Sequence, residues 1–265
     1  MQSWRFATWN LDVHQRNPRL ASPWDLIAST SAEVFAIQEL KGSDIEVLRD
    51  KHPGESLFSL DYRPDSNRTW SSCALLLPKD AEVLDVGVVP GLPRVQRSLW
   101  ARVELPGIGQ MTVVSWHAEH GAGAEGRVRK PVAFRAMSAW LVEAPRPLAL
   151  GADVNSWSDR VDLVKPEPDD SNYEEHAFVG LDPAHGLVDA YRAVLERRGE
   201  FDALRESAPE GPLAVSHVLP SGSTRRDRVY VSPGLTPIDG AYVFDEAKQA
   251  GSDHALHWVE LDPPT

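Results

Sequence analysis

Cysteine is nearly absent from this sequence, whose 265 residues include only Cys73. One cysteine cannot form a disulfide within the chain, and it cannot supply the thiolates of a cysteine zinc site. Cys73 opens the apolar run 73–77, so we expect it to be a small buried side chain. The sequence therefore excludes an intrachain disulfide framework.

Positive charge is scarce as well, because 27 Lys and Arg residues stand against 39 Asp and Glu residues, a formal net charge of −12. A protein that binds nucleic acid mainly by overall electrostatic attraction needs an excess of positive charge. A bound cation supplies positive charge locally, so the balance still permits a metal-centred phosphate site.

Long hydrophobic runs are also missing. No apolar stretch approaches the length of a membrane span, and residues 1–6 lack the basic start of a secretory signal, so we expect a cytoplasmic protein. Hydrophobic residues make up 42% of the chain, which is enough for a sizeable core. We expect a single domain over residues 1–265 that is a monomer.

Short apolar or alternating runs, separated by Gly, Pro, Asp and Asn, predict many strands and a few helices. The expected strands cover residues 4–11, 33–38, 74–77, 82–88, 98–104, 110–117, 147–151, 213–219, 228–232, 241–244 and 255–261. The expected helices cover residues 23–29, 44–51, 131–142 and 187–198, with Pro131 in a first turn. Residues 121–126 and 156–185 are expected to be loops. This order predicts two sheets packed face to face and flanked by helices.

Two polar clusters at the ends of apolar runs carry most of the chemical information. In Gly-Ala-Asp153-Val-Asn155 an acid and an amide lie two residues apart, so on a strand they point to one face. In Ser-Asp253-His254 an acid and an imidazole precede an apolar run. Such oxygen donors beside an imidazole suit a hard divalent cation and phosphate chemistry. Each motif alone is also typical of a turn.

Four further polar residues begin or end apolar runs: Asn10, Glu39, His117 and Asp227. Each has a plainer interpretation, respectively a turn amide, a solvated carboxylate, a structural histidine and a partner of neighbouring arginines. Their occurrence together, with one polar group at each strand end, favours a shared site.

The order of the motifs resembles the endonuclease/exonuclease/phosphatase superfamily. The matching motifs are Trp-Asn10, Gln-Glu39, His117, Gly-Ala-Asp153-Val-Asn155, Arg-Asp227-Arg and Ser-Asp253-His254. The resemblance extends over nearly the whole chain, and the Asp-x-Asn and Ser-Asp-His motifs are its specific part. It implies an α/β fold of DNase I-like type: a four-layer α/β sandwich in which two mixed β-sheets pack face to face between helices.

The resemblance also implies a metal site. Glu39 matches the main metal carboxylate of the family, and Asn10 and Asp253 match residues near the cation. The implied cofactor is Mg²⁺, with Mn²⁺ as a substitute, held by one or two carboxylates, waters and the substrate phosphate.

The remaining residues match catalytic positions. Asp153 is similar to the residue that orients or deprotonates the attacking water, and Asn155 to a donor to a phosphate oxygen. His254 resembles the imidazole that stabilises the transition state, with Asp227 fixing its tautomer. His117 looks like a second phosphate-contacting histidine.

The sequence departs from the family in two places. His120 lies close enough to His117 to compete for its role, and residues 215–218 lack the aromatic residue expected in many nucleases. Strand alternation places Arg226 and Arg228 on the face opposite Asp227, so only a bulge would let either residue contact phosphate.

Other residues near the motifs bear on the substrate. The basic residues Arg127, Arg129, Lys130, Arg225, Arg226 and Arg228 are interpreted as solvated loop groups. Trp157 is placed either to stack on a base or to anchor a loop.

The resemblance implies a metal-dependent phosphoesterase that directs water in line onto phosphorus. We expect a nuclease-like phosphodiester hydrolase whose substrate is nucleic acid or a small phosphodiester. The alternative enzyme is a phosphomonoesterase acting on an inositol phosphate or lipid head group. Two further hypotheses remain: a non-catalytic phosphate-binding module with the same fold, and an unrelated α/β protein whose motifs are turns.

Overall fold

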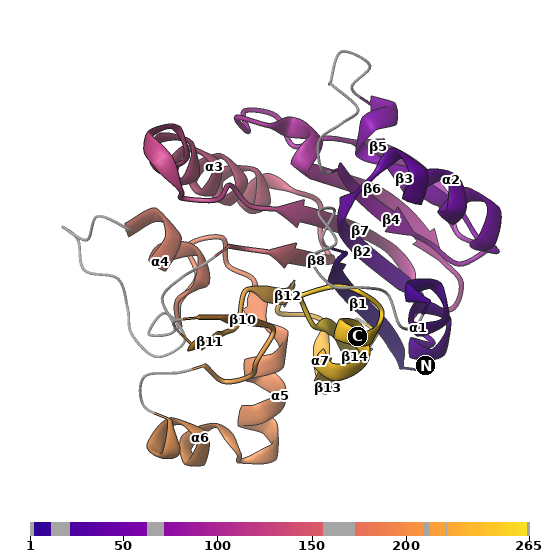
Figure 1. Ribbon diagram of the computed structural model, residues 1–265. Helices are drawn as coiled ribbons and strands as arrows, with labels where there is room; N and C mark the ends of the chain where they lie inside the picture. The colour runs from indigo at the N-terminus through magenta and orange to yellow at the C-terminus, as the bar shows by residue number, and fades with distance from the viewer. Residues whose placement is uncertain are drawn as a thin grey trace.

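Two six-stranded mixed sheets form the centre of the molecule, which is represented by a computed structural model (Figure 1). The structure describes residues 3–11, 22–62, 72–155, 173–208, 212–220 and 222–263. The two sheets contact each other through β1 and β8, β2 and β7, and β4 and β6. Helices cover both outer faces, so the expected four-layer α/β sandwich is confirmed.

The first sheet has the strand order β13-β14-β1-β2-β4-β3. Its strands are β13 (Thr236–Val243), β14 (Leu256–Asp262), β1 (Trp4–Asn10), β2 (Val34–Leu40), β4 (Ser72–Leu76) and β3 (Ser56–Phe58). The second sheet has the order β5-β6-β7-β8-β12-β9. Its strands are β5 (Glu82–Gly87), β6 (Ser98–Leu105), β7 (Gly109–His117), β8 (Leu148–Asp153), β12 (Asp227–Val231) and β9 (Val188–Asp189). A separate hairpin pairs β10 (His217–Leu219) with β11 (Gly222–Thr224).

The helices lie outside the two sheets. They are α1 (Pro23–Thr30), α2 (Gly42–Lys51), α3 (Gly123–Glu143), α4 (Tyr173–Val179), α5 (Ala190–Arg198), α6 (Phe201–Ser207) and α7 (Phe244–Gln249), with 3₁₀ turns η1 (Ser59–Tyr62) and η2 (Val95–Arg97). Apolar residues of α1, α2 and α7 pack on the first sheet, while those of α3 and α4 pack on the second. Among the described residues, no helix is long and apolar enough to cross a membrane.

Burial on both faces explains why the strands read as nearly continuous apolar runs. Phe6 of β1 faces the core between the sheets, while Trp9 of the same strand packs under the outer helices. Cys73 is fully buried, as expected, and burial raises the pKa of its thiol to about 12.

The two sheets approach each other closely near the end of β8. A Cβ atom on Gly151 would lie 2.7 Å from the Cβ atoms of both Thr8 and Ala36, so a larger residue does not fit. A buried amide bridges the sheets at the same level, where Gln38 Nε2 donates to Thr8 Oγ1 at 3.1 Å and to Ser115 Oγ at 3.0 Å. This contact fixes the spacing of the sheets beside the strand ends.

Several sequence-based boundaries are wrong. Helix α3 begins at Gly123, so Pro131 lies inside it and residues 123–126 are not a loop. Pro131 is tolerated because Ala133, Phe134 and Met137 pack on the second sheet and hold the helix in place.

Other corrections concern the second half of the chain. The expected helix over residues 187–198 begins at Ala190, because Asp189 is its N-cap and accepts a hydrogen bond from the amide of Arg192. The strand expected over 213–219 is reduced to β10, and β13 starts five residues before the expected strand at 241. Within the expected loop 156–185, residues 173–179 form α4, and residues 156–172 lie outside the described residues.

Candidate functional site

Strand register brings polar residues together at one edge of the two sheets. β1 and β2 are parallel, as are β7 and β8, so each pair ends at the same edge. His117 pairs directly with Asp153, and Asp153 pairs directly with Asp227 at the start of β12. Asn10 and Glu39 end the neighbouring strands of the other sheet. The sequence motifs therefore converge because the topology places their strand ends side by side.

Asp153 is the centre of this group and is 1% exposed. Its Oδ2 accepts a hydrogen bond from Asn10 Nδ2 at 2.8 Å, and its Oδ1 accepts one from the amide of Asn155 at 2.9 Å. Burial alone would raise the pKa of the carboxyl, but the charges of His254 and Arg226 and the hydrogen bond from the Asn155 amide outweigh burial and lower it. Asp153 is therefore a buried carboxylate that stays ionised at neutral pH.

His254 lies beside a second buried carboxylate. Its Nδ1 is 2.8 Å from Oδ2 of Asp227, which is fully buried. Burial by itself lowers the pKa of this imidazole, but Asp227 and Asp153 together raise it to about 10. The ring is therefore an imidazolium at neutral pH, with Nδ1 donating to Asp227.

The pKa of His117 is shifted in the opposite direction to that of His254. Burial, and then the guanidinium of Arg97, hold its pKa well below the ordinary value. Its Nε2 accepts a hydrogen bond from Arg97 Nη2 and lies 3.2 Å from Oε1 of Glu39 and 3.6 Å from Oδ2 of Asp153. His120 is exposed, and its Nδ1 accepts from the amide of Ala122 instead. The contacts with the site carboxylates thus belong to His117.

Local backbone geometry orients the side chains of Glu39 and Asn155. Glu39 has a φ of 56°, and the pairing of β2 with β4 shifts register between Ile37 and Leu40. Such an irregularity at a strand end redirects a side chain. Asn155 also has a left-handed φ, 47°, and its Nδ2 donates to the carbonyl of Ala118 at 3.1 Å.

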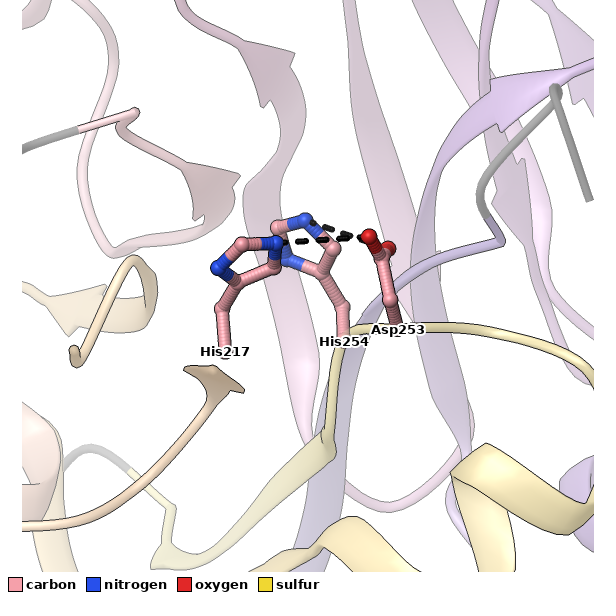
Figure 2. Close-up of side chains that lie close together, drawn as sticks. All are labelled: His217, Asp253 and His254. Atoms are coloured by element: carbon pink, nitrogen blue, oxygen red, sulfur yellow. Dashed lines mark hydrogen bonds and ion pairs between the residues drawn. The ribbon is translucent and has the colours of Figure 1, made fainter. Parts of the chain in front are cut away.

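Asp253 and His217 lie beside His254 (Figure 2). His217 Nε2 is 3.3 Å from Asp253 Oδ2, and His254 Nε2 is 3.8 Å from Asp253 Oδ1. His217 was not among the site residues predicted from the sequence. The signal was available, because His217 occupies the segment where an aromatic residue was expected.

The donor chemistry fits a divalent cation. Glu39 and Asp253 keep side-chain exposures of 18% and 23%, whereas Asp153 and Asp227 are almost fully buried. Because Asn10 Nδ2 donates to Asp153, Asn10 would offer its oxygen to a metal. Carboxylate and amide oxygens at an accessible position are the ligands that Mg²⁺ prefers.

The interpretation of the basic residues as solvated loop groups is wrong for most of them. Arg127 is exposed, but Lys130, Arg225, Arg226 and Arg228 are all buried. Arg225 and Arg228 lie 2.7 Å and 3.1 Å from Oδ2 of Asp189, so this pairing is structural. Trp157 lies outside the described residues.

Two of these buried cations, Arg226 and Lys130, interact with residues of the site. Arg226 precedes β12, so strand alternation does not govern it, and its charge helps to lower the pKa of Asp153. The argument from strand alternation therefore does not apply to Arg226. Lys130 donates to the carbonyl of Asn155 at 2.9 Å and lies 2.5 Å from Oε2 of Glu175.

Comparison with known proteins supports the architecture. No protein-family model and no curated protein matches the sequence. Among solved structures, TDP2 of D. rerio complexed with a single-strand DNA product is 17% identical, with a TM-score of 0.67 over 99% of this chain and 100% of that chain. The human Nocturnin catalytic domain with a bound sulfate anion is 16% identical, with a TM-score of 0.62 over 98% and 94%. An endonuclease/exonuclease/phosphatase from Bacteroides vulgatus is 16% identical, with a TM-score of 0.62 over 99% and 100%. The chain thus has the endonuclease/exonuclease/phosphatase fold.

Proposed function

We propose that the protein is a metal-dependent phosphodiester hydrolase of the nuclease-like type. The observation that carries this proposal is the placement of a buried carboxylate, Asp153, and a buried imidazole, His254, within 4.8 Å of each other. A carboxylate can orient or deprotonate water, and an imidazole N–H can donate a hydrogen bond to negative oxygen. Both effects accelerate the in-line attack of water on phosphorus.

Asp153 is suited to position and deprotonate the attacking water. Asn10 and Asn155 each donate to one of its oxygens, so its orientation is fixed before substrate binds. A pre-oriented base loses little freedom on reaching the transition state. The lowered pKa of this carboxyl keeps it ionised, and a cation bound nearby would lower the pKa of the water that it contacts.

His254 is suited to bind the phosphate. Asp227 holds Nδ1, which leaves the Nε2–H of the imidazolium to donate to a non-bridging oxygen. That hydrogen bond strengthens as negative charge accumulates on phosphorus oxygens in the transition state. Glu39, Asp253 and Asn10 would hold Mg²⁺, and the bound ion would supply charge neutralisation that these residues cannot.

Two observations support the proposed substrate class. The net charge of −12 argues against tight binding of long duplex DNA by electrostatics. A protein of the same fold has been solved with a single-strand DNA product. We therefore place short single-stranded nucleic acid and small phosphodiesters first among the candidates.

The test is a substrate panel assayed with Mg²⁺ or Mn²⁺ and with EDTA. It contains single-stranded DNA, duplex DNA, RNA, a chromogenic diester, a chromogenic monoester and inositol phosphates. Asp153→Asn should lower the rate on the preferred diester by about 10²–10⁴-fold, the range for loss of a general base. The matched control is Asp61→Asn, because Asp61 is an exposed acid paired with Arg49 away from the site.

Three results would contradict the proposal. They are absence of hydrolysis of every diester, activity that persists in EDTA, and an Asp153→Asn variant as active as Asp61→Asn. Faster hydrolysis of the monoester than of any diester would favour the phosphatase alternative.

A further inference from the structure

Two imidazoles and one carboxylate converge beside the candidate phosphate site. Figure 2 shows His217 and His254 side by side, with Asp253 facing both rings. The ring centroids of the two histidines are 4.5 Å apart. Asp253 Oδ2 lies 3.3 Å from His217 Nε2, and Asp253 Oδ1 lies 3.8 Å from His254 Nε2.

These three residues supply a donor set that differs from that of a magnesium site. Mg²⁺ prefers oxygen ligands and retains several waters. Two imidazole nitrogens and a carboxylate are the ligand set of many zinc sites, with the fourth position left to water or substrate. All three residues offer ligand atoms within 4.8 Å of one another. Ligand atoms of tetrahedral zinc lie roughly 3.3–3.5 Å apart, since each is ~2.0–2.1 Å from the ion.

The surrounding structure orients the ligands. Asp227 holds the Nδ1 atom of His254, so the ring presents Nε2, in the carboxylate–histidine–metal arrangement that raises ligand basicity. An isolated backbone bridge joins His217 to His254, and the amide of Ala255 donates to the carbonyl of Ser216 at 2.7 Å. Both histidines are buried, so neither ring has to be ordered when an ion binds.

We propose that His217, Asp253 and His254 form a site for Zn²⁺ or a similar transition-metal ion, and that filling this site blocks phosphate binding. The block follows from the chemistry of His254 Nε2. When the lone pair of this nitrogen binds a metal, the nitrogen carries no proton and cannot donate a hydrogen bond to a phosphate oxygen. The binding site stands on geometry alone, whereas the block rests on the proposed hydrolase function.

Cobalt provides a direct probe of the site, because Co²⁺ replaces Zn²⁺ and absorbs strongly in the visible range when it is tetrahedral. Chelator-treated protein is titrated with Co²⁺ and then with Zn²⁺, and affinity is measured by calorimetry. The wild type should show a tetrahedral cobalt spectrum that Zn²⁺ abolishes and Mg²⁺ does not. His217→Gln should bind Zn²⁺ at least tenfold more weakly.

The matched control is His52→Gln. His52 Nε2 contacts the carbonyl of Leu77 at 2.8 Å, a contact that a glutamine amide can retain. Thermal unfolding of each variant checks that it is folded. A second variant, His217→Cys, keeps a metal ligand at the position and should add a thiolate-to-cobalt charge-transfer band, which a merely structural role for His217 would not produce.

Two outcomes would overturn the zinc site. One is equal Zn²⁺ affinity in folded His217→Gln and His52→Gln. The other is the absence of both a tetrahedral spectrum in the wild type and the thiolate band in His217→Cys.

A second assay separates the site from the proposed function. Zn²⁺ should inhibit Mg²⁺-dependent hydrolysis by the wild type, and His217→Gln should need at least tenfold more Zn²⁺ for the same fractional inhibition of its own rate. Zinc binding without inhibition would overturn the block. Zinc binding by a protein that hydrolyses nothing would keep the site and refute the hydrolase proposal instead.

Discussion

Asp227 Oδ2 lies 2.8 Å from Nδ1 of His254, and this contact joins a fully buried carboxylate to a buried imidazole. Both residues lie at the edge where β12 begins and β14 is about to begin, so the pair ties the second sheet to the first. The same contact sets the charge, the tautomer and the orientation of the ring. The first two predictions below concern this pair.

Asp227→Asn should separate orientation from charge. The amide keeps the shape of the side chain but removes the negative charge that raises the pKa of His254 to about 10. The imidazole pKa should fall by more than one unit, and the alkaline limb of the pH–rate profile should move to lower pH by the same amount, because the imidazolium is the proposed donor to phosphate. Imidazole chemical shifts across a pH titration measure the first effect. An unchanged His254 titration would contradict the assignment of its raised pKa to Asp227.

The free energy of unfolding should depend on pH through His254. Its pKa is raised from 6.5 to about 10 in the folded chain, so the stabilisation is fully present below pH 6.5 and is lost as pH rises towards 10. The slope contributed by one such group is at most about 1.4 kcal/mol per pH unit. Urea unfolding in EDTA, at intervals from pH 6 to 10, should show this decline in the wild type and a flatter profile in His254→Gln. Parallel profiles for the two proteins would refute it.

Lys130→Met should lower the free energy of unfolding. The substitution removes the hydrogen bond to the carbonyl of Asn155 and the 2.5 Å ion pair with buried Glu175. Removal of one partner of a buried pair costs about 3–5 kcal/mol, because the remaining charge stays buried. The added substitution Glu175→Leu should recover part of that loss.

An exposed arginine of the same helix gives the control for that measurement. Arg135 is exposed and lies 2.5 Å from Oε1 of Glu174. Exposed pairs contribute about 0–1 kcal/mol, so Arg135→Met should change the free energy of unfolding little. Equal losses from Lys130→Met and Arg135→Met would show that burial of the Lys130–Glu175 pair adds no stability.

Gly151→Ala should test the close approach of the two sheets. The new Cβ atom would lie 2.7 Å from the Cβ atoms of Thr8 and Ala36, so the sheets must separate locally. Overpacking of this kind typically costs about 1–3 kcal/mol. Gly42→Ala is the control, because no atom lies within 4 Å of its added Cβ and the position is helical. A Gly151→Ala variant as stable as Gly42→Ala would contradict the packing described above.

Local pattern made the site residues predictable from the sequence. Asp153 and Asn155 follow an apolar run with strand spacing, and Asp253 and His254 precede another, so each pair was visible within a few residues. The resemblance to a known family then put Glu39 and His117 in order around them. The structure brings all of these residues to one edge, and their chemical roles remain proposals.

Contacts between distant segments were not predictable in the same way. Arg97 reaches His117 from a 3₁₀ turn, and Glu175 pairs with Lys130 from a separate helix, so no local spacing reveals either contact. Pro131 led to a wrong predicted start for α3, because proline is common in the first turn of a helix and disfavoured in its interior. Only tertiary packing explains why the helix continues through it. His217 was overlooked because its partner lies 36 residues away.

The direct pairing of His117, Asp153 and Asp227 across three adjacent strands has a consequence for protein engineering. Neighbouring strands are held about 4.7–4.9 Å apart by their backbone hydrogen bonds, so the sheet sets the spacing of these three residues. The spacing of these three residues therefore does not depend on the loops around them, so exchange of a loop with another protein of this fold should leave that spacing unchanged.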